Sequence, residues 1–297
     1  MTDGFDQVDT IIFDLDGVLV DVSGSYRRAV KESVEIVYGQ SFKEDLIQRY
    51  KDLGGFNNDW KVTYACALYV LTREHCETLS LDSWVEAVRS SGKGLEAAEM
   101  AIDDFLSGDE RETIIDRWSQ EKLRSIFQEL YLGSDDFSRL ENRESTLERP
   151  GYIHSEPVIV NDQFFRWVRE SFNLGVLTGR PREEAEIALE RIGWDIDGDA
   201  LIAMEDWDKE KPSPDGLLRL AETLNASNII YTGDTLDDVR TAKNATESDN
   251  HRQYFGVGVL TGGLSGEEGR EKYKTAGAAS IINSINDLPS LVEENYP

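Results

Sequence analysis

The chain has 297 residues, of which 39% are hydrophobic, and its 58 acidic residues outnumber 31 basic ones for a formal net charge of −27 at pH 7. This length suffices for one sizeable core and an additional domain, and no apolar run approaches the ~18 residues of a membrane span. So acidic a surface argues against nucleic-acid binding, and because the N-terminus is acidic rather than a basic leader, we expect a cytoplasmic protein.

The first predicted element is a short strand that ends in paired acids. Ile11, Ile12 and Phe13 are β-branched or aromatic, as in a parallel strand buried on both faces, and Asp14 and Asp16 follow directly. In open α/β sheets, ligands bind at the carboxyl ends of strands, where these two carboxylates would lie. On this segment alone, an ordinary Asp-rich turn explains the residues equally well.

A long helical insertion follows, because the chain between Asp14 and Thr178 far exceeds a single crossover helix. Its apolar residues recur at helical spacing, which predicts an all-α domain over 23–150 between core segments 1–22 and 151–297. A glycine-turn segment within it contains the candidate substrate-selecting residues Asn57, Asn58, Asp59 and Trp60. A loop that joins two helices and carries an Asn or Asp cap would look the same.

Three later segments also place polar residues at or near predicted strand ends. Thr178 and Gly179 end an apolar run, where a hydroxyl and a close backbone amide suit an anion. Lys211 precedes two prolines and a helix-starting pattern. Asp234 and Asp238 follow the predicted strand at 229–231 and flank the start of a helix. Taken singly, these residues also fit a turn, a solvated lysine and two helix caps.

As an ordered set, the four segments resemble the motifs of the haloacid dehalogenase superfamily. The resemblance covers residues 8–22 and 155–285 and is weak between them. It implies an α/β fold, with a modified Rossmann-like three-layer parallel-sheet core and an inserted all-α cap domain. It also implies a magnesium ion and an aspartyl-phosphate intermediate. The insertion is larger than the usual cap of this family, with an extra pair of helices expected around 76–110.

The paired acids can be given separate chemical roles. Asp14 is the expected nucleophile, since a carboxylate can attack phosphorus and form a covalent acyl phosphate. Asp16 is the expected general acid and base. Asp14 and Asp234 supply carboxylate oxygens to Mg²⁺, and the family pattern adds the backbone carbonyl of Asp16.

The remaining motif residues are expected to bind the phosphoryl group or support its ligands. Lys211, the Thr178 hydroxyl and the Gly179 amide would contact the phosphoryl oxygens. Asp238 would either reach the metal through water or orient Lys211. Whether Asp237 or Asp238 is the main supporting acid stays open.

These roles predict a Mg²⁺-dependent phosphatase that hydrolyses the phosphate monoester of a small metabolite. A second aspartate at position 16 favours phosphoryl transfer over dehalogenation, because displacing halide requires no protonated alkoxide. The alternatives are a phosphomutase with the same chemistry and a non-catalytic binding protein with the same fold. The substrate and the oligomeric state stay open.

The dispersed acidity also suggests the environment of the protein. Acids occur throughout the chain, and lysine supplies only 11 of the 31 basic residues. Such a surface is favoured in a high-salt cytoplasm, where screening relieves the repulsion between acids. We therefore expect the protein to come from a halophilic organism, and specifically from an archaeon.

Overall fold

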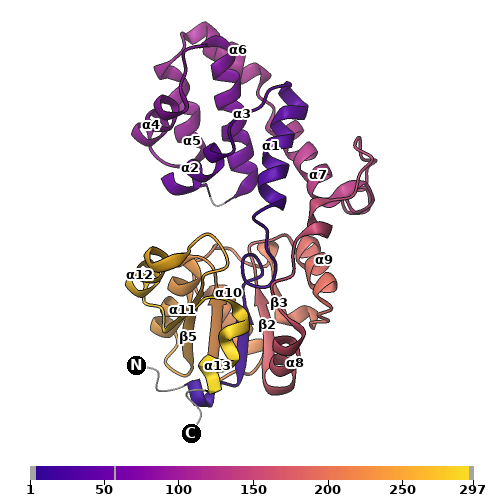
Figure 1. Ribbon diagram of the computed structural model, residues 1–297, viewed down its shortest axis with the longest axis vertical. Coiled ribbons are helices and arrows are strands. Elements are labelled where there is room, and N and C mark those ends of the chain that lie inside the picture. Colours follow the sequence, from indigo (N-terminus) through magenta and orange to yellow (C-terminus); the bar gives the residue numbers. More distant parts are fainter. Residues whose placement is uncertain (1–4, 57, 294–297) are drawn as a thin grey trace. The chain divides into compact units, whose positions relative to one another are not determined.

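The computed structural model describes residues 5–56 and 58–293 and divides the chain into two compact units (Figure 1). The core unit comprises 1–23 and 156–297, and the helical unit comprises 24–155. The sequence predicts divisions after residues 22 and 150, whereas the structure divides after Ser23 and Ser155. Each unit is described by itself.

The core unit contains a six-stranded parallel sheet with the order β3-β2-β1-β4-β5-β6, which confirms the predicted fold class. The strands are β1 (Thr10–Phe13), β2 (Asn173–Leu177), β3 (Leu201–Ile202), β4 (Asn228–Gly233), β5 (Gln253–Val259) and β6 (Ser280–Ile282). All four residues of β1 are buried, as expected for a central strand covered on both faces.

Two short edge strands correct the sequence prediction. The sequence predicts the last core strand and its exit loop over 258–263 and only a short apolar segment at 280–282, whereas β5 spans Gln253–Val259 and the last strand is β6, at Ser280–Ile282. The strand β3 is not predicted at all. Strands of two or three residues are too short to show alternating hydrophobicity, so their sequence carries no periodic pattern.

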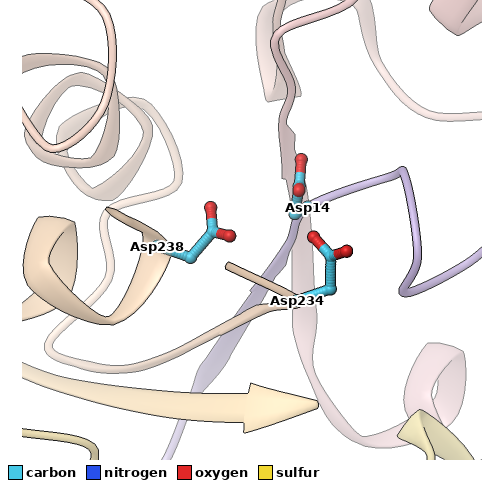
Figure 2. A group of neighbouring side chains, drawn as sticks. All are labelled: Asp14, Asp234 and Asp238. Carbon is cyan, nitrogen blue, oxygen red and sulfur yellow. The ribbon is translucent and has the colours of Figure 1, made fainter. Parts of the chain in front are cut away.

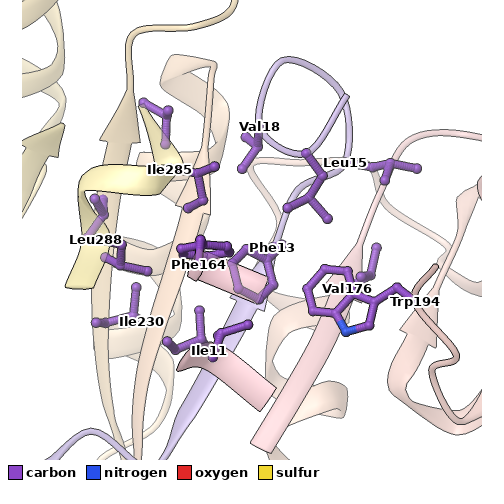
Figure 3. Close-up of a cluster of buried hydrophobic side chains, with 14 of the residues drawn as sticks. Ile11, Phe13, Leu15, Val18, Phe164, Val176, Trp194, Ile230, Ile285 and Leu288 are labelled. Atoms are coloured by element: carbon purple, nitrogen blue, oxygen red, sulfur yellow. The ribbon is translucent and has the colours of Figure 1, made fainter. Parts of the chain in front are cut away.

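Helices cover both faces of the sheet because successive strand residues point to opposite sides. Ile11 and Phe13 pack into a cluster with α8, α9 and α13 (Figure 3). Ile12 packs into a second cluster with α10 and α11. Tyr273 of α12 lies against Gly258, where a Cβ would overlap its ring. The helices are α8 (Asp162–Ser171), α9 (Arg182–Ile192), α10 (Asp215–Thr223), α11 (Leu236–Ser248), α12 (Gly266–Ala276) and α13 (Leu288–Glu293).

The helical unit consists of helices and connecting loops throughout its described residues. Its helices are α1 (Ser25–Tyr38), α2 (Asp45–Leu53), α3 (Asp59–His75), α4 (Leu81–Ser91), α5 (Gly94–Met100), α6 (Gly108–Arg117) and α7 (Gln120–Glu141). The central helix α3 is buried continuously over 62–72, and α1 packs against α3 and α7. The helices α4 and α5 lie in the region where an extra pair is predicted. Among the described residues, no helix combines the length and apolar character required to cross a membrane.

The two segments that join the insertion to the core run beside each other within the core unit. The amide of Asp21 donates to the carbonyl of Pro157 at 2.8 Å, and the amide of Ile159 donates to that of Leu19 at 2.9 Å. The two segments therefore form a short backbone-paired stem at the base of the insertion.

Candidate active site

The carboxyl ends of three neighbouring strands bring polar residues to one edge of the sheet. The central strand β1 pairs with β2 on one side and with β4 on the other. Asp14 follows β1, Thr178 follows β2 and Asp234 follows β4. The amide of Asp14 continues the ladder by donating to the carbonyl of Thr232 at 2.8 Å, which fixes where its side chain begins.

Three of these acids form one cluster. Asp14, Asp234 and Asp238 each offer an oxygen, and the three oxygens lie within 4.8 Å of one another (Figure 2). Lys211 joins two of them, since its Nζ lies 3.0 Å from Oδ1 of Asp14 and 2.7 Å from Oδ1 of Asp238. The structure thus brings together two predicted metal ligands, the predicted phosphate-binding lysine and the predicted supporting acid.

The electrostatics of this cluster favour a bound cation. Burial raises the pKa of Asp14 to about 7, and the charges of Asp238 and Asp16 add to the effect while Lys211 opposes it. Burial and the charge of Asp14 also raise the pKa of Asp234 well above its usual value. One ammonium therefore does not balance the three carboxylates. Their hard oxygen donors suit a divalent cation such as Mg²⁺, whose charge would offset the excess.

Asp238 is the ionised partner of Lys211. Although burial acts in the opposite direction, Lys211 and three hydroxyl or ammonium hydrogen bonds lower the pKa of Asp238. The donors include the Tyr231 hydroxyl at 2.8 Å and the Thr235 hydroxyl at 2.6 Å. Asp237 instead pairs with Arg240 at 3.0 Å. Of the two acids left open by the sequence, Asp238 is the one that contacts the lysine. Tyr231, which also contacts Asp238, belongs to no sequence motif.

Two glycine loops enclose the Asp234 carboxylate. A Cβ at either Gly17 or Gly262 would overlap this carboxylate, and Gly17 has a φ of +69°. The amide of Gly263 donates to Oδ2 of Asp234 at 3.3 Å, and the hydroxyl of Thr261 donates to the carbonyl of Gly17 at 2.5 Å. The sequence predicts 258–263 as a strand and its exit loop and assigns it no role in the site. The Thr-Gly step after an apolar run, also present at Thr178, is the pattern that could have indicated this role.

Asp16 lies outside the cluster of three acids and pairs with an arginine. Its Oδ1 lies 2.5 Å from Nε of Arg180, whose Nη2 lies 2.9 Å from Oε2 of Glu156. Thr178 is fully buried, and its hydroxyl accepts from the amide of Arg180 at 3.2 Å. Among the described residues, chain neighbours apart, no heavy atom lies within 4 Å of the position that a Cβ on Gly179 would take, so space adjoins its backbone.

In the helical unit, the predicted substrate-selecting residues have partners within that unit. Asn58 caps α3 by accepting from the amides of Trp60 and Lys61, and Asp59 pairs with Lys51 at 3.1 Å. The indole of Trp60 donates to Gln128 at 3.1 Å. The helix-cap explanation therefore accounts for Asn58. Asn57 lies outside the described residues.

Comparisons with known proteins agree with this fold. A model of haloacid dehalogenase-like hydrolases matches residues 8–246. An X-ray structure from the Northeast Structural Genomics Consortium aligns over 96% of this chain and 98% of its own, with a TM-score of 0.69 and 18% identity. A phosphatase from Thermococcus thioreducens aligns over 82% of this chain and 91% of its own, with a TM-score of 0.62 and 25% identity.

An imidazoleglycerol-phosphate dehydratase from Phytophthora nicotianae is 25% identical over 240 residues, which cover 80% of this chain. The match covers 42% of that protein, so this chain spans less than half the length of this relative. The family model, by contrast, extends over both units and includes Asp14, Thr178, Lys211 and Asp234. This protein belongs to the haloacid dehalogenase-like hydrolases.

Proposed function

We propose that this protein is a Mg²⁺-dependent phosphatase that hydrolyses the phosphate monoester of a small metabolite. The observation that carries the proposal is the ammonium of Lys211 between Asp14 and Asp238, beside a third carboxylate on Asp234. Phosphoryl transfer by this route requires a nucleophile, a positively charged side chain and carboxylate ligands for a metal ion, and this cluster contains all three kinds of group. The similarity to a phosphatase from Thermococcus thioreducens supports the same reaction class.

Asp14 and Asp234 would hold the magnesium ion, with the backbone carbonyl of Asp16 as a third ligand. When bound, this ion neutralises charge between the attacking carboxylate and the phosphoryl oxygens. Lys211, the hydroxyl of Thr178 and the amide of Gly179 would bind the phosphoryl oxygens and stabilise their charge in the transition state.

The reaction has two displacements. In the first, a carboxylate oxygen of Asp14 bonds to phosphorus, the ester P–O bond breaks, and Asp16 gives its proton to the leaving oxygen. In the second, a water oxygen bonds to phosphorus, the P–O bond to Asp14 breaks, and the water loses a proton to Asp16. Inorganic phosphate leaves, and both aspartates return to their starting states.

The test is phosphate release by purified protein in high salt, with Mg²⁺ and with EDTA, against a panel of phosphorylated metabolites. Asp14→Asn should lower turnover by about 10³-fold or more, because the nucleophile is lost. Asp237→Asn is the matched control, since this nearby acid pairs with Arg240 and should leave turnover nearly unchanged. Phosphate release that does not depend on Mg²⁺ or on Asp14 would contradict the proposal. An isomeric ester formed in place of inorganic phosphate would identify a mutase.

The dispersed negative charge supports a further proposal about environment, namely the saline cytoplasm of a halophilic archaeon. Of the 297 residues, 58 are acidic, and they would repel one another in dilute buffer. The same charge supports a small-molecule substrate over nucleic acid.

A further inference from the structure

Arg180 connects Asp16 to a buried carboxylate. The side chain of Arg180 is 1% exposed, and its Nε lies 2.5 Å from Oδ1 of Asp16. Its Nη2 lies 2.9 Å from Oε2 of Glu156, whose side chain is 0% exposed. A guanidinium has a planar, fixed arrangement of donors, so contacts of two of its nitrogens with two different carboxylates restrict its orientation.

The backbone of Arg180 is anchored as well. Its amide donates to the Thr178 hydroxyl at 3.2 Å, and its carbonyl accepts from the amide of Met204 at 2.9 Å. The carbonyl of Glu156 accepts from Arg191 at 2.6 Å. Both ends of the Arg180–Glu156 pair are therefore fixed by neighbouring elements of the core unit, and little freedom is left for the guanidinium.

Asp16, in contrast, has one oxygen bound to this rigid group and a side chain that is 29% exposed. The carboxylate is thus restrained in direction and still reachable. This combination suits a group that must exchange a proton with a leaving oxygen, because proton transfer requires hydrogen-bond reach in a defined orientation. Removing an arginine and a glutamate from water together carries a desolvation penalty, so the buried pair is better explained by a functional role than by a gain in stability.

We propose that Arg180, held by Glu156, is a positioning residue that keeps Asp16 oriented toward the leaving oxygen. The inference rests on the proposed function, and it extends that function by assigning roles to two residues that the sequence motifs leave without one. Arg180 acts through Asp16 and does not itself touch the reacting atoms in this proposal.

The test uses substituted phenyl phosphates, which differ in the leaving group and little in size. A good leaving group such as 4-nitrophenolate departs without a proton, whereas phenolate needs one. In Arg180→Lys and Arg180→Gln, kcat/KM for phenyl phosphate should fall at least about tenfold more than kcat/KM for 4-nitrophenyl phosphate. Glu156→Gln should show the same selective loss to a smaller degree, which also covers the case in which an Arg180 variant fails to fold.

The matched control is Arg182→Gln, which removes a nearby arginine that pairs with Asp206 at 2.5 Å. This variant should change kcat/KM by the same factor for phenyl phosphate and for 4-nitrophenyl phosphate. Equal losses for both substrates in the Arg180 and Glu156 variants, or no loss, would overturn the positioning role. If the wild-type protein releases no phosphate from either aryl ester or from any ester of the metabolite panel, the proposed function itself fails, and the positioning role fails with it.

Discussion

Replacing Asp14 with asparagine should stabilise the protein in magnesium-free buffer while abolishing turnover. Burial and neighbouring acids raise the pKa of Asp14 from 3.8 to about 7. The folded state therefore favours the protonated carboxyl more than the unfolded state does. The resulting destabilisation begins as pH rises above the unfolded pKa and is complete above the folded pKa.

The size of this effect follows from the pKa shift. A difference of roughly three units corresponds to about 4 kcal/mol once pH exceeds the folded value, at about 1.4 kcal/mol per unit. At pH about 5.5 only about 2 kcal/mol of this cost is present. The stability advantage of Asp14→Asn should therefore grow by about 2 kcal/mol between pH ~5.5 and pH ~8.5.

Urea unfolding at constant KCl and with EDTA measures this difference, since urea adds no ionic strength. Asp237→Asn controls for the loss of one negative charge near the site. Saturating Mg²⁺ should reduce or reverse the advantage, because a bound cation favours the ionised carboxylate of the wild type. If the difference in unfolding free energy between Asp14→Asn and the wild type stays constant or shrinks as pH rises, the electrostatic reasoning is refuted.

Three further changes test other parts of the structure. Gly262→Ala should weaken Mg²⁺ binding about tenfold or more, because a Cβ there overlaps the Asp234 carboxylate, and titration calorimetry measures the affinity. Gly263→Ala is the control, because among the described residues, chain neighbours apart, no heavy atom lies within 4 Å of its Cβ position. Glu129→Gln should lower the free energy of unfolding measured with urea by about 2 kcal/mol, because this buried carboxylate accepts hydrogen bonds from the amide of Thr146 at 2.6 Å and from other donors in 145–147. An unchanged free energy of unfolding would contradict this. The unfolding temperature should rise by about 5 °C or more between about 0.1 M and about 2 M KCl, and an equal or lower value in high salt would exclude the halophilic hypothesis.

The parts of the fold and site that the sequence predicts are those with a local pattern. The strand β1 is a run of buried apolar residues with acids directly after it, and Asp14, Thr178 and Asp234 follow strands in the same way. Since the carboxyl ends of parallel strands lie at the same edge of a sheet, the fold class already predicts that these three residues lie close together. The helical insertion is likewise evident from its length and its helical periodicity.

The parts that the sequence does not predict depend on contacts between distant segments. Glu156 precedes Arg180 in a segment without a motif, and only the fold places the two side chains 2.9 Å apart. Tyr231 occupies a strand position that any large apolar residue would suit, so its hydrogen bond to Asp238 is invisible in the sequence. Asn58 lies in a glycine-turn segment whose composition suits both a substrate-selecting loop and a helix cap, so the sequence does not show that its side chain caps α3.

The backbone-paired stem beneath the insertion has a consequence for how this architecture can vary. Because Asp21 bonds to Pro157 and Leu19 to Ile159, the chain leaves and rejoins the core at nearly the same place. The core strands would keep their order and register if the inserted segment were shortened, lengthened or exchanged. The inserted unit can therefore be replaced as one continuous stretch of sequence, while the residues at the strand ends retain their geometry.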